Sequence, residues 1–318
     1  QTQLARYLRT ATGFKGEVNA GGFHAQAFAA KIAASHRHDE IQGGGISGPY
    51  RLSSRAIVAN SETVQIEVRD RFRSEVVVDR RSLSRFIDYD IDLLSGTITF
   101  KEPVLRRDAA LNPQFIVIDY EIDETARGGA LNAGLRADYT TANGKLRVGA
   151  SAITDTGSGG PDAARTNLAA LDVRARLGEG TELRAELGVS RREGEQAKAW
   201  LVEAEHHDGK LDLLAYARSS DQDYGVGQMT GAERGRRKYG LDARLQVTEP
   251  ISLTASTWYD DSLTDASHRF ATQLGALYRT PKTDARLGVA MMRDHLADGR
   301  DANSTVLEGG VTQRLANN

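Results

Sequence analysis

The sequence predicts an all-β protein whose largest part is an antiparallel transmembrane β-barrel. Three observations support this fold class. From Gly129 onward, apolar and polar residues alternate with period two, the spacing of the two faces of a strand. The predicted strands are joined alternately by short turns and long polar loops, as in outer-membrane barrels. The polar face carries too many charges for a dry core, so it must contact water.

The composition excludes several classes of function. Only 40% of the 318 residues are hydrophobic, and the chain has no cysteine. Disulfide frameworks, thiol nucleophiles and cysteine-based metal sites are therefore excluded. The formal net charge of −2 at pH 7 argues against nucleic acid as a partner. No run of 18 consecutive apolar residues is present, so we expect no transmembrane helix.

Residues 1–40 are expected to form N-terminal barrel strands. Apolar residues at alternate positions of 14–18 and 23–29 flank a turn at residues 19–22. This pattern predicts one hairpin. A polar stretch at residues 36–40 follows it.

Residues 41–127 differ in character and are expected to form an inserted, small β-sandwich-like domain. Their β-branched content is higher, and their length is enough for a sandwich with its own core. The strand before them runs from the short-turn end toward the long-loop end. We therefore expect the domain to be extracellular, in place of one long loop. The segments richest in β-branched residues are 63–68, 74–78, 97–100 and 115–118.

Residues 128–318 are expected to form about eleven barrel strands, with short periplasmic turns and long extracellular loops. With the first hairpin the total is about thirteen, whereas a single-chain bacterial barrel has an even number of strands. We therefore expect this chain to be a fragment of a barrel of about 14 or more strands. The short turns are expected at 141–144, 178–180, 208–209, 248–250 and 280–282. The long loops are expected at 154–165, 191–196, 219–236, 260–267 and 294–303.

Several motifs of the inserted domain resemble a β-domain of large bacterial surface proteins. Similar segments, with Ser-Glu, Asp-Tyr-x-Ile-Asp and Ser-Gly-Thr-Ile-Thr-Phe patterns, occur in the outer-membrane translocon of gliding motility and type IX secretion and in related proteins. The resemblance implies a surface location and a large barrel, and it implies no catalytic residue. The motifs lie at residues 48–52, 61–71, 85–92, 95–100, 111–113 and 119–121.

The predicted lumen is lined by charged side chains of both signs. They fall on the polar face of the barrel strands, opposite the apolar rows. One interpretation is a charged pore lining that selects solutes. The other is cross-strand ion pairs that stabilise neighbouring strands by roughly a few tenths of a kcal/mol each, and both can hold together. The expected lumen-lining residues are Arg136, Asp138, Arg147, Asp172, Arg174, Arg176, Arg184, Glu186, Asp242, Arg244 and Arg286.

Asp88, Asp90 and Asp92 form a weak calcium candidate. Their alternate positions place three carboxylates on one face of a strand. The EF-hand pattern fails, because Leu93 stands where a glycine is needed. A solvated strand edge that leads into a hairpin explains these residues better.

Two histidine pairs, His36 with His38 and His206 with His207, lie near carboxylates. Neither pair shows the three or four converging ligands that a metal site needs, so we interpret both as solvated side chains. Nucleophile elbows, Walker loops and dinucleotide-binding loops are absent from the sequence. We therefore expect no enzyme activity, no cofactor and no metal beyond the weak calcium candidate.

These patterns indicate a surface protein of the Gram-negative bacterial outer membrane. The first hypothesis is a non-enzymatic, porin-like pore or conduit that transports solutes or macromolecules. The alternative is a membrane-anchored adhesion or binding module that acts through the inserted domain. A third hypothesis keeps the chain soluble, with its apolar faces packed on another sheet. Expected partners are membrane lipid, other outer-membrane or surface proteins, and glycans.

Overall fold

The structure is a computed structural model that describes residues 2–7, 13–32, 34–71, 76–108, 112–123, 130–156, 165–226 and 233–314. Within these ranges the chain forms strands, turns and irregular segments without an α-helix, so the all-β fold class is confirmed. The same ranges contain no helix that is long and apolar enough to span a membrane. The strands form one large sheet and two small ones.

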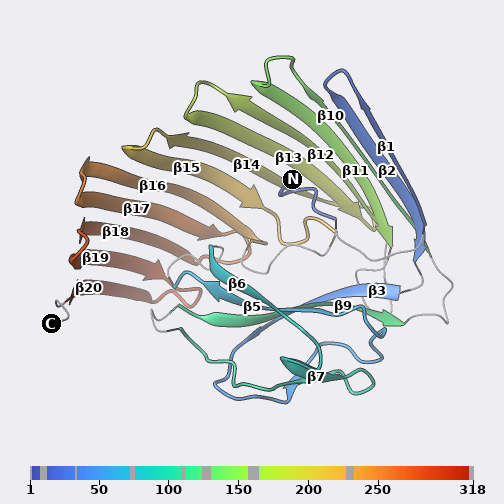
Figure 1. The fold of residues 1–318 in the computed structure, drawn as a ribbon. Coiled ribbons are helices and arrows are strands. Elements are labelled where there is room, and N and C mark those ends of the chain that lie inside the picture. Colours follow the sequence, from blue (N-terminus) through green and yellow to red (C-terminus); the bar gives the residue numbers. More distant parts are fainter. Residues whose placement is uncertain are drawn as a thin grey trace.

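The large sheet has thirteen strands, and each neighbouring pair is antiparallel. Figure 1 shows it as a strongly curved trough. The strands from β10 onward agree in number with those expected after Gly129. In order across the sheet, the strands are β1 (Gly13–Ala20), β2 (Phe23–Ile32), β10 (Ala130–Thr140), β11 (Leu146–Thr156), β12 (Arg165–Arg176), β13 (Thr181–Arg192), β14 (Glu195–His207), β15 (Leu211–Ser220), β16 (Arg236–Thr248), β17 (Ile251–Ser262), β18 (His268–Arg279), β19 (Thr283–His295) and β20 (Asp301–Gln313).

β1 and β20 are the two edges of this sheet. Within the described part of the chain, neither edge pairs with a further strand, so the sheet is open where the sequence predicted a barrel. Because thirteen is an odd number, the two edge strands of the antiparallel sheet run in the same direction. Antiparallel closure therefore needs an odd number of additional strands.

The strands are staggered along the sheet. Tyr139 lies near the short-turn end of β10, whereas Phe270 lies near the opposite end of β18. One row of direct cross-strand partners nevertheless joins them, so each strand is displaced along its axis relative to the one before. This stagger accompanies strand tilt in barrels. The row consists of Tyr139, Val148, Val173, Ala185, Val202, Ala217, Tyr239, Tyr259 and Phe270.

The connections at the two ends of the large sheet alternate less regularly in length than expected. The expected long loop at 191–196 is a tight turn of Glu193 and Gly194, which both have positive φ, 52° and 91°. Glu is uncommon at positive φ, so the sequence carried only a weak turn signal there. The loop expected at 294–303 is also shorter, residues 296–300. Residues 157–164 and 227–232 of the other long connections lie outside the described ranges.

Between β2 and β10 the chain forms a separate domain, which we call the insert (residues 34–123). One sheet has the order β3-β9-β5-β6 and the other β4-β8-β7. The barrel strands expected within residues 1–40 end earlier, because residues 34–42 pair with β9 of the insert. Of the strand expected at 74–78, residues 74–75 lie outside the described ranges. The strands are β3 (Ala34–Gln42), β4 (Tyr50–Arg51), β5 (Thr63–Arg69), β6 (Val77–Leu83), β7 (Tyr89–Asp92), β8 (Thr97–Phe100) and β9 (Gln114–Asp123).

The insert has its own dry core between its two sheets. Ile98 of β8 and Ile116 and Ile118 of β9 are completely buried there. In Figure 1 the insert lies on the inner side of the curved large sheet, at the end where β2 finishes and β10 begins. An ion pair between Arg71 of the insert and Glu308 of β20 joins the two parts.

Candidate functional site

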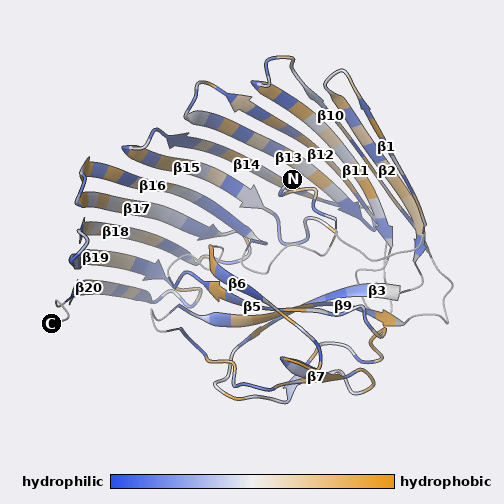
Figure 2. Ribbon diagram, in the orientation of Figure 1, coloured by the Kyte–Doolittle hydropathy of each residue, from blue (hydrophilic) through white to orange (hydrophobic). Residues whose placement is uncertain are grey.

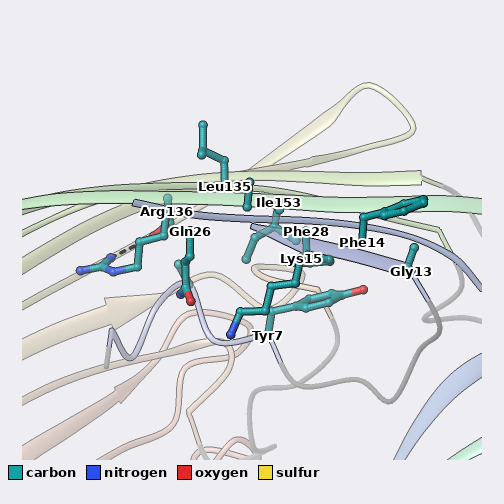
Figure 3. Close-up of a pocket in the computed structure, with 14 residues that line it drawn as sticks. Tyr7, Gly13, Phe14, Lys15, Gln26, Phe28, Leu135, Arg136 and Ile153 are labelled. Carbon is teal, nitrogen blue, oxygen red and sulfur yellow. Dashed lines mark hydrogen bonds between the residues drawn. The ribbon is translucent and has the colours of Figure 1, made fainter. Parts of the chain in front are cut away.

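The two faces of the large sheet can be told apart by their surroundings. We call the inner side of the curve, where residues 2–7 lie, the concave face, and the outer side the convex face (Figure 1). Figure 3 shows Leu135 and Arg136, neighbours in β10, on opposite sides of the sheet, with Arg136 on the side of Tyr7. The alternation of hydrophobic and hydrophilic residues along the strands is visible in Figure 2.

The convex face is apolar and exposed. Within the described residues of the thirteen strands, every exposed large hydrophobic side chain lies on this face. Leu171 and Leu187, direct partners on β12 and β13, are each 60% exposed. Leu241 of β16 and Leu287 of β19 continue this surface at 40% and 68%. Soluble monomers rarely expose so large a continuous apolar surface.

The concave face carries the charges, and β10, β11 and β12 place several of them together. The Arg136 guanidinium donates two hydrogen bonds to the Asp172 carboxylate, at 2.7 and 3.0 Å. Arg147 donates two to Asp138, both at 2.9 Å. A ring nitrogen of His24 lies 3.2 Å from the same Asp138 carboxylate. Paired guanidinium–carboxylate bonds of this kind are strong and directional. Arg147 and Asp138 join the neighbouring strands β11 and β10, whereas Arg136 reaches Asp172 of β12 across Gly149 of β11.

Further pairs lie toward the short-turn end. Arg174 is 2.5 Å and Arg176 is 3.5 Å from the Glu182 carboxylate. Arg184 donates to Glu203 at 2.9 Å. These contacts match the cross-strand pairing interpretation of the predicted lumen residues.

The remaining predicted lumen residues have different surroundings. Asp242 accepts a hydrogen bond from Ser256 at 2.5 Å. Arg244 lines a shallow hollow that Asp242 shares. Arg286 lies beside Gly310 of the neighbouring β20. Glu186 is 2% exposed and, unlike the other ten, binds backbone groups of residues 2–7. A pore-lining role for the eleven residues stays a prediction.

Residues 2–7, which we call the strap, lie against the concave face. The backbone N–H groups of Gln3 and Leu4 each donate to Glu186 Oε2 at 2.9 Å. The Tyr7 hydroxyl donates to Asp155 Oδ1 at 3.0 Å, and the Tyr224 hydroxyl donates to the Leu4 carbonyl at 2.8 Å. The strap could not be recognised in the sequence, because its hydrogen bonds join residues more than 140 positions apart.

Beside the strap there is a cavity of about 430 Å³, shown in Figure 3. The Tyr7 and Phe28 rings stack along it with centroids 5.1 Å apart. Lys15, Gln26 and Arg136 also line it and supply polar side chains. The cavity therefore combines an aromatic wall with hydrogen-bond donors.

The insert holds a continuous, partly buried chain of charges on the outer face of its four-stranded sheet. The ring nitrogens of His38 lie 2.8 Å from Asp119 and 3.0 Å from Glu40. Arg69 joins Glu40 at 2.9 Å and Glu67 at 2.8 Å. Burial opposes the charge of His38, but the two carboxylates outweigh burial and raise its pKa to about 9. Burial likewise opposes ionisation of Glu40, yet His38 and Arg69 lower its pKa to about 2.

The weak calcium candidate is not assembled in the structure. Asp88 accepts the N–H of Ser84, whereas Asp90 pairs with Lys101. Asp92 accepts the N–H groups of Leu94 and Ser95 in a turn, as Asp side chains often do. Since each carboxylate has a separate local partner, the three do not converge on one point.

The histidine pairs also have local partners. His36 is 7% exposed and its Nε2 lies 3.2 Å from Asp119. His38 belongs to the partly buried chain of charges in the insert, so the expectation that these two histidines are solvated is wrong. His206 contacts Thr181 at 2.8 Å, and His207 pairs with Asp212. Among the described residues, no group of three or more His, Asp or Glu side chains could hold a metal ion.

No family model and no curated protein sequence matches the chain. Matching solved structures include a bacterial polysaccharide outer membrane secretin, with 12% identity and a TM-score of 0.34 over 90% of this chain and 100% of that one. Another is OccK9 (OpdG) of Pseudomonas aeruginosa, with 15% identity and a TM-score of 0.32 over 93% of this chain and 74% of that one. The resemblance of the insert to translocon domains stays a prediction.

Proposed function

We propose that the chain is a non-enzymatic outer-membrane β-barrel protein that acts as a pore or conduit for solutes or macromolecules. One observation carries this proposal: the apolar convex face is exposed, while the concave face holds the ion pairs. Lipid on the outside and water on the inside satisfy both faces. A soluble sandwich would have to cover the convex face with another sheet.

The membrane assignment imposes a condition on the two edges. In a bilayer, the backbone N–H and C=O groups of β1 and β20 cannot stay unpaired. The membrane-inserted form therefore has these edges paired. The insert, at the end with the longer connections, is placed outside the cell by analogy with other outer-membrane barrels.

Two measurements on the full chain test the proposal. The protein is expected to partition into detergent micelles as a β-rich species whose gel mobility changes on heating. In planar lipid bilayers it is expected to produce discrete ion conductance. A water-soluble monomer without detergent, or a silent bilayer after verified insertion, would contradict the conduit.

A second candidate function, binding through the insert, is favoured by one observation. Phe86 and Ile87 are 73% and 75% exposed at the turn between β6 and β7, and Phe86 has a φ of 69°. Positive φ is strained for a bulky residue, and such strain is concentrated at functional sites. A glycan array probed with the intact protein and with Phe86→Ser tests this role. Loss of a wild-type signal in the variant would support it, and an equal or absent signal would not.

A further inference from the structure

The strap crosses the concave face at several strands. Tyr7 is bound at Asp155 of β11 and stacks on Phe28 of β2. Leu4, only 7% exposed, is bound at Glu186 of β13. The strap therefore lies where the proposed conduit has its water-filled interior (Figure 1).

The part of the concave face beneath Leu4 is apolar, whereas most of this face is polar. Leu4 packs into a buried cluster on β11, β12 and β14 and the connection after β15. This burial removes the Leu4 side chain from water and favours the docked position. The other members of the cluster are Ile153, Leu168, Ala170, Ala197, Ala199, Leu201, Tyr224 and Val226.

Two glycines give aromatic rings room beneath the strap. A Cβ at Gly188 of β13 would overlap Tyr224 Oη, the group that donates to the Leu4 carbonyl. A Cβ at Gly134 of β10 would overlap the Phe28 ring, on which Tyr7 stacks. The absence of a side chain at these two glycines therefore leaves room on the concave face for the two aromatic rings that contact the strap.

Glu186 makes the attachment that a substitution can test most selectively. Both of its carboxylate oxygens accept the Gln3 N–H, at 3.1 and 2.9 Å, and Oε2 also accepts the Leu4 N–H. Bonds from N–H groups to a buried carboxylate are among the stronger hydrogen bonds. Glutamine would remove the charge and place an NH₂ donor against a backbone donor in either orientation of its amide.

We propose that the strap is a constriction of the conduit, with Glu186 as the residue that positions it. The inference rests on the proposed function and deepens it. The strap occupies part of the interior and leaves the cavity beside Tyr7 and Phe28 (Figure 3) as the adjoining space. When the strap is released, the concave face along β11 to β14 is open to solutes.

Two readouts on the full chain test this inference. The first is labelling: the chain has no cysteine, so Leu4→Cys introduces a single thiol that a maleimide can probe in detergent. We expect slow labelling with Glu186 present and labelling roughly tenfold faster with Glu186→Gln added, because the charged attachment is lost. The second is conductance of the cysteine-free protein and of Glu186→Gln and Gly188→Ala in planar bilayers, which we expect to rise in both variants.

Glu249→Gln provides the matched control. Glu249 lies in the short turn between β16 and β17, and the substitution changes the charge equally. Conductance that is present but unchanged in Glu186→Gln and Gly188→Ala would overturn the constriction, as would an equal rise in Glu249→Gln. Equal Leu4→Cys labelling with Glu186 and Gln at position 186 would overturn the attachment. Silent bilayers for all variants, with labelling still accelerated, would refute the conduit and leave the attachment of the strap supported.

Discussion

The insert and the large sheet use the same alternation of apolar and polar residues for opposite purposes. In the insert, Ile98 of one sheet and Ile118 of the other lie between the two sheets and are completely buried. In the large sheet, Leu171 and Leu187 occupy the same kind of alternate position and are 60% exposed. The apolar rows of the insert have a second sheet to cover them, whereas those of the convex face are exposed in the described part of the chain.

The polar faces differ as well. The insert has one continuous chain of charges, which is most deeply buried at Arg69, 2% exposed. On the concave face Asp138 contacts both Arg147 and Arg136, at 2.9 and 3.5 Å, but the Arg147 side chain is 39% exposed. Period two therefore predicts which residues share a face, and the neighbouring layer determines whether that face is dry, wet or in lipid.

Removal of a core side chain should have the largest effect and should be confined to the insert. Ile118→Ala is expected to destabilise the insert by about 2–5 kcal/mol, because it leaves a cavity in a closed core. Leu171→Ala on the convex face should cost at most about 1 kcal/mol, because lipid can fill the space. Hydrogen-exchange mass spectrometry of both variants measures the two regions separately. Equal losses of stability in the two regions would contradict the claim that only the insert has a closed apolar core.

A charged substitution on the convex face should destabilise the protein nearly as much. Leu241→Arg is expected to destabilise the protein by about 2–4 kcal/mol in lipid, if the position is near the bilayer midplane. Arg174→Ser, on the concave face, should have a small effect, because its side chain is 44% exposed to water. Equilibrium unfolding in lipid vesicles provides the measurement. Similar tolerance at both positions would contradict the assignment of the faces.

The insert should show a pH dependence that comes from His38 and Glu40. The pKa of His38 is raised from 6.5 to about 9. Its contribution is therefore complete below pH 6.5 and is lost as the pH rises through 9. The pKa of Glu40 is lowered from 4.5 to about 2, so its contribution is complete above pH 4.5 and lost as the pH falls through 2.

The free energy of unfolding of the insert is therefore expected to be highest between pH 4.5 and pH 6.5. It should fall by roughly 2–3 kcal/mol from pH 6 to pH 9. Hydrogen exchange of β3 and β9 at several pH values measures the change, after correction for the intrinsic rate. His38→Gln should flatten the alkaline side of the profile. A wild-type profile that is already flat there would show that the carboxylates do not hold the proton.

The smallest effect is expected for a single concave ion pair. A double-mutant cycle of Arg136→Gln and Asp172→Asn should give a coupling of about 1 kcal/mol, because the pair is bidentate but remains near water. Unfolding of the four proteins in vesicles gives this value. A coupling above about 3 kcal/mol would instead indicate a dry site like that of the insert.

The sequence predicted the strands of the large sheet well, because alternation is a local property that neighbouring residues reveal. It missed the turn at Glu193, where a residue that seldom takes positive φ does so. It also placed residues 34–40 with the barrel, since polar side chains on β3 hide a strand whose partner, β9, is distant in sequence. Tyr224 and Asp155 could not be linked to the strap in advance, because only the fold brings them together.

The apolar convex face in contact with lipid is the central claim, and a single-cysteine scan of β16 tests it most directly. The chain has no native thiol, so a fluorophore can be attached at each position from Tyr239 to Gln246 in lipid vesicles. Brominated lipid is expected to quench the odd-numbered positions, including Leu241 and Leu245. Aqueous iodide should quench the even-numbered positions, including Asp242. Quenching without this two-residue alternation, or odd-numbered positions reached by iodide and not by lipid, would contradict the account.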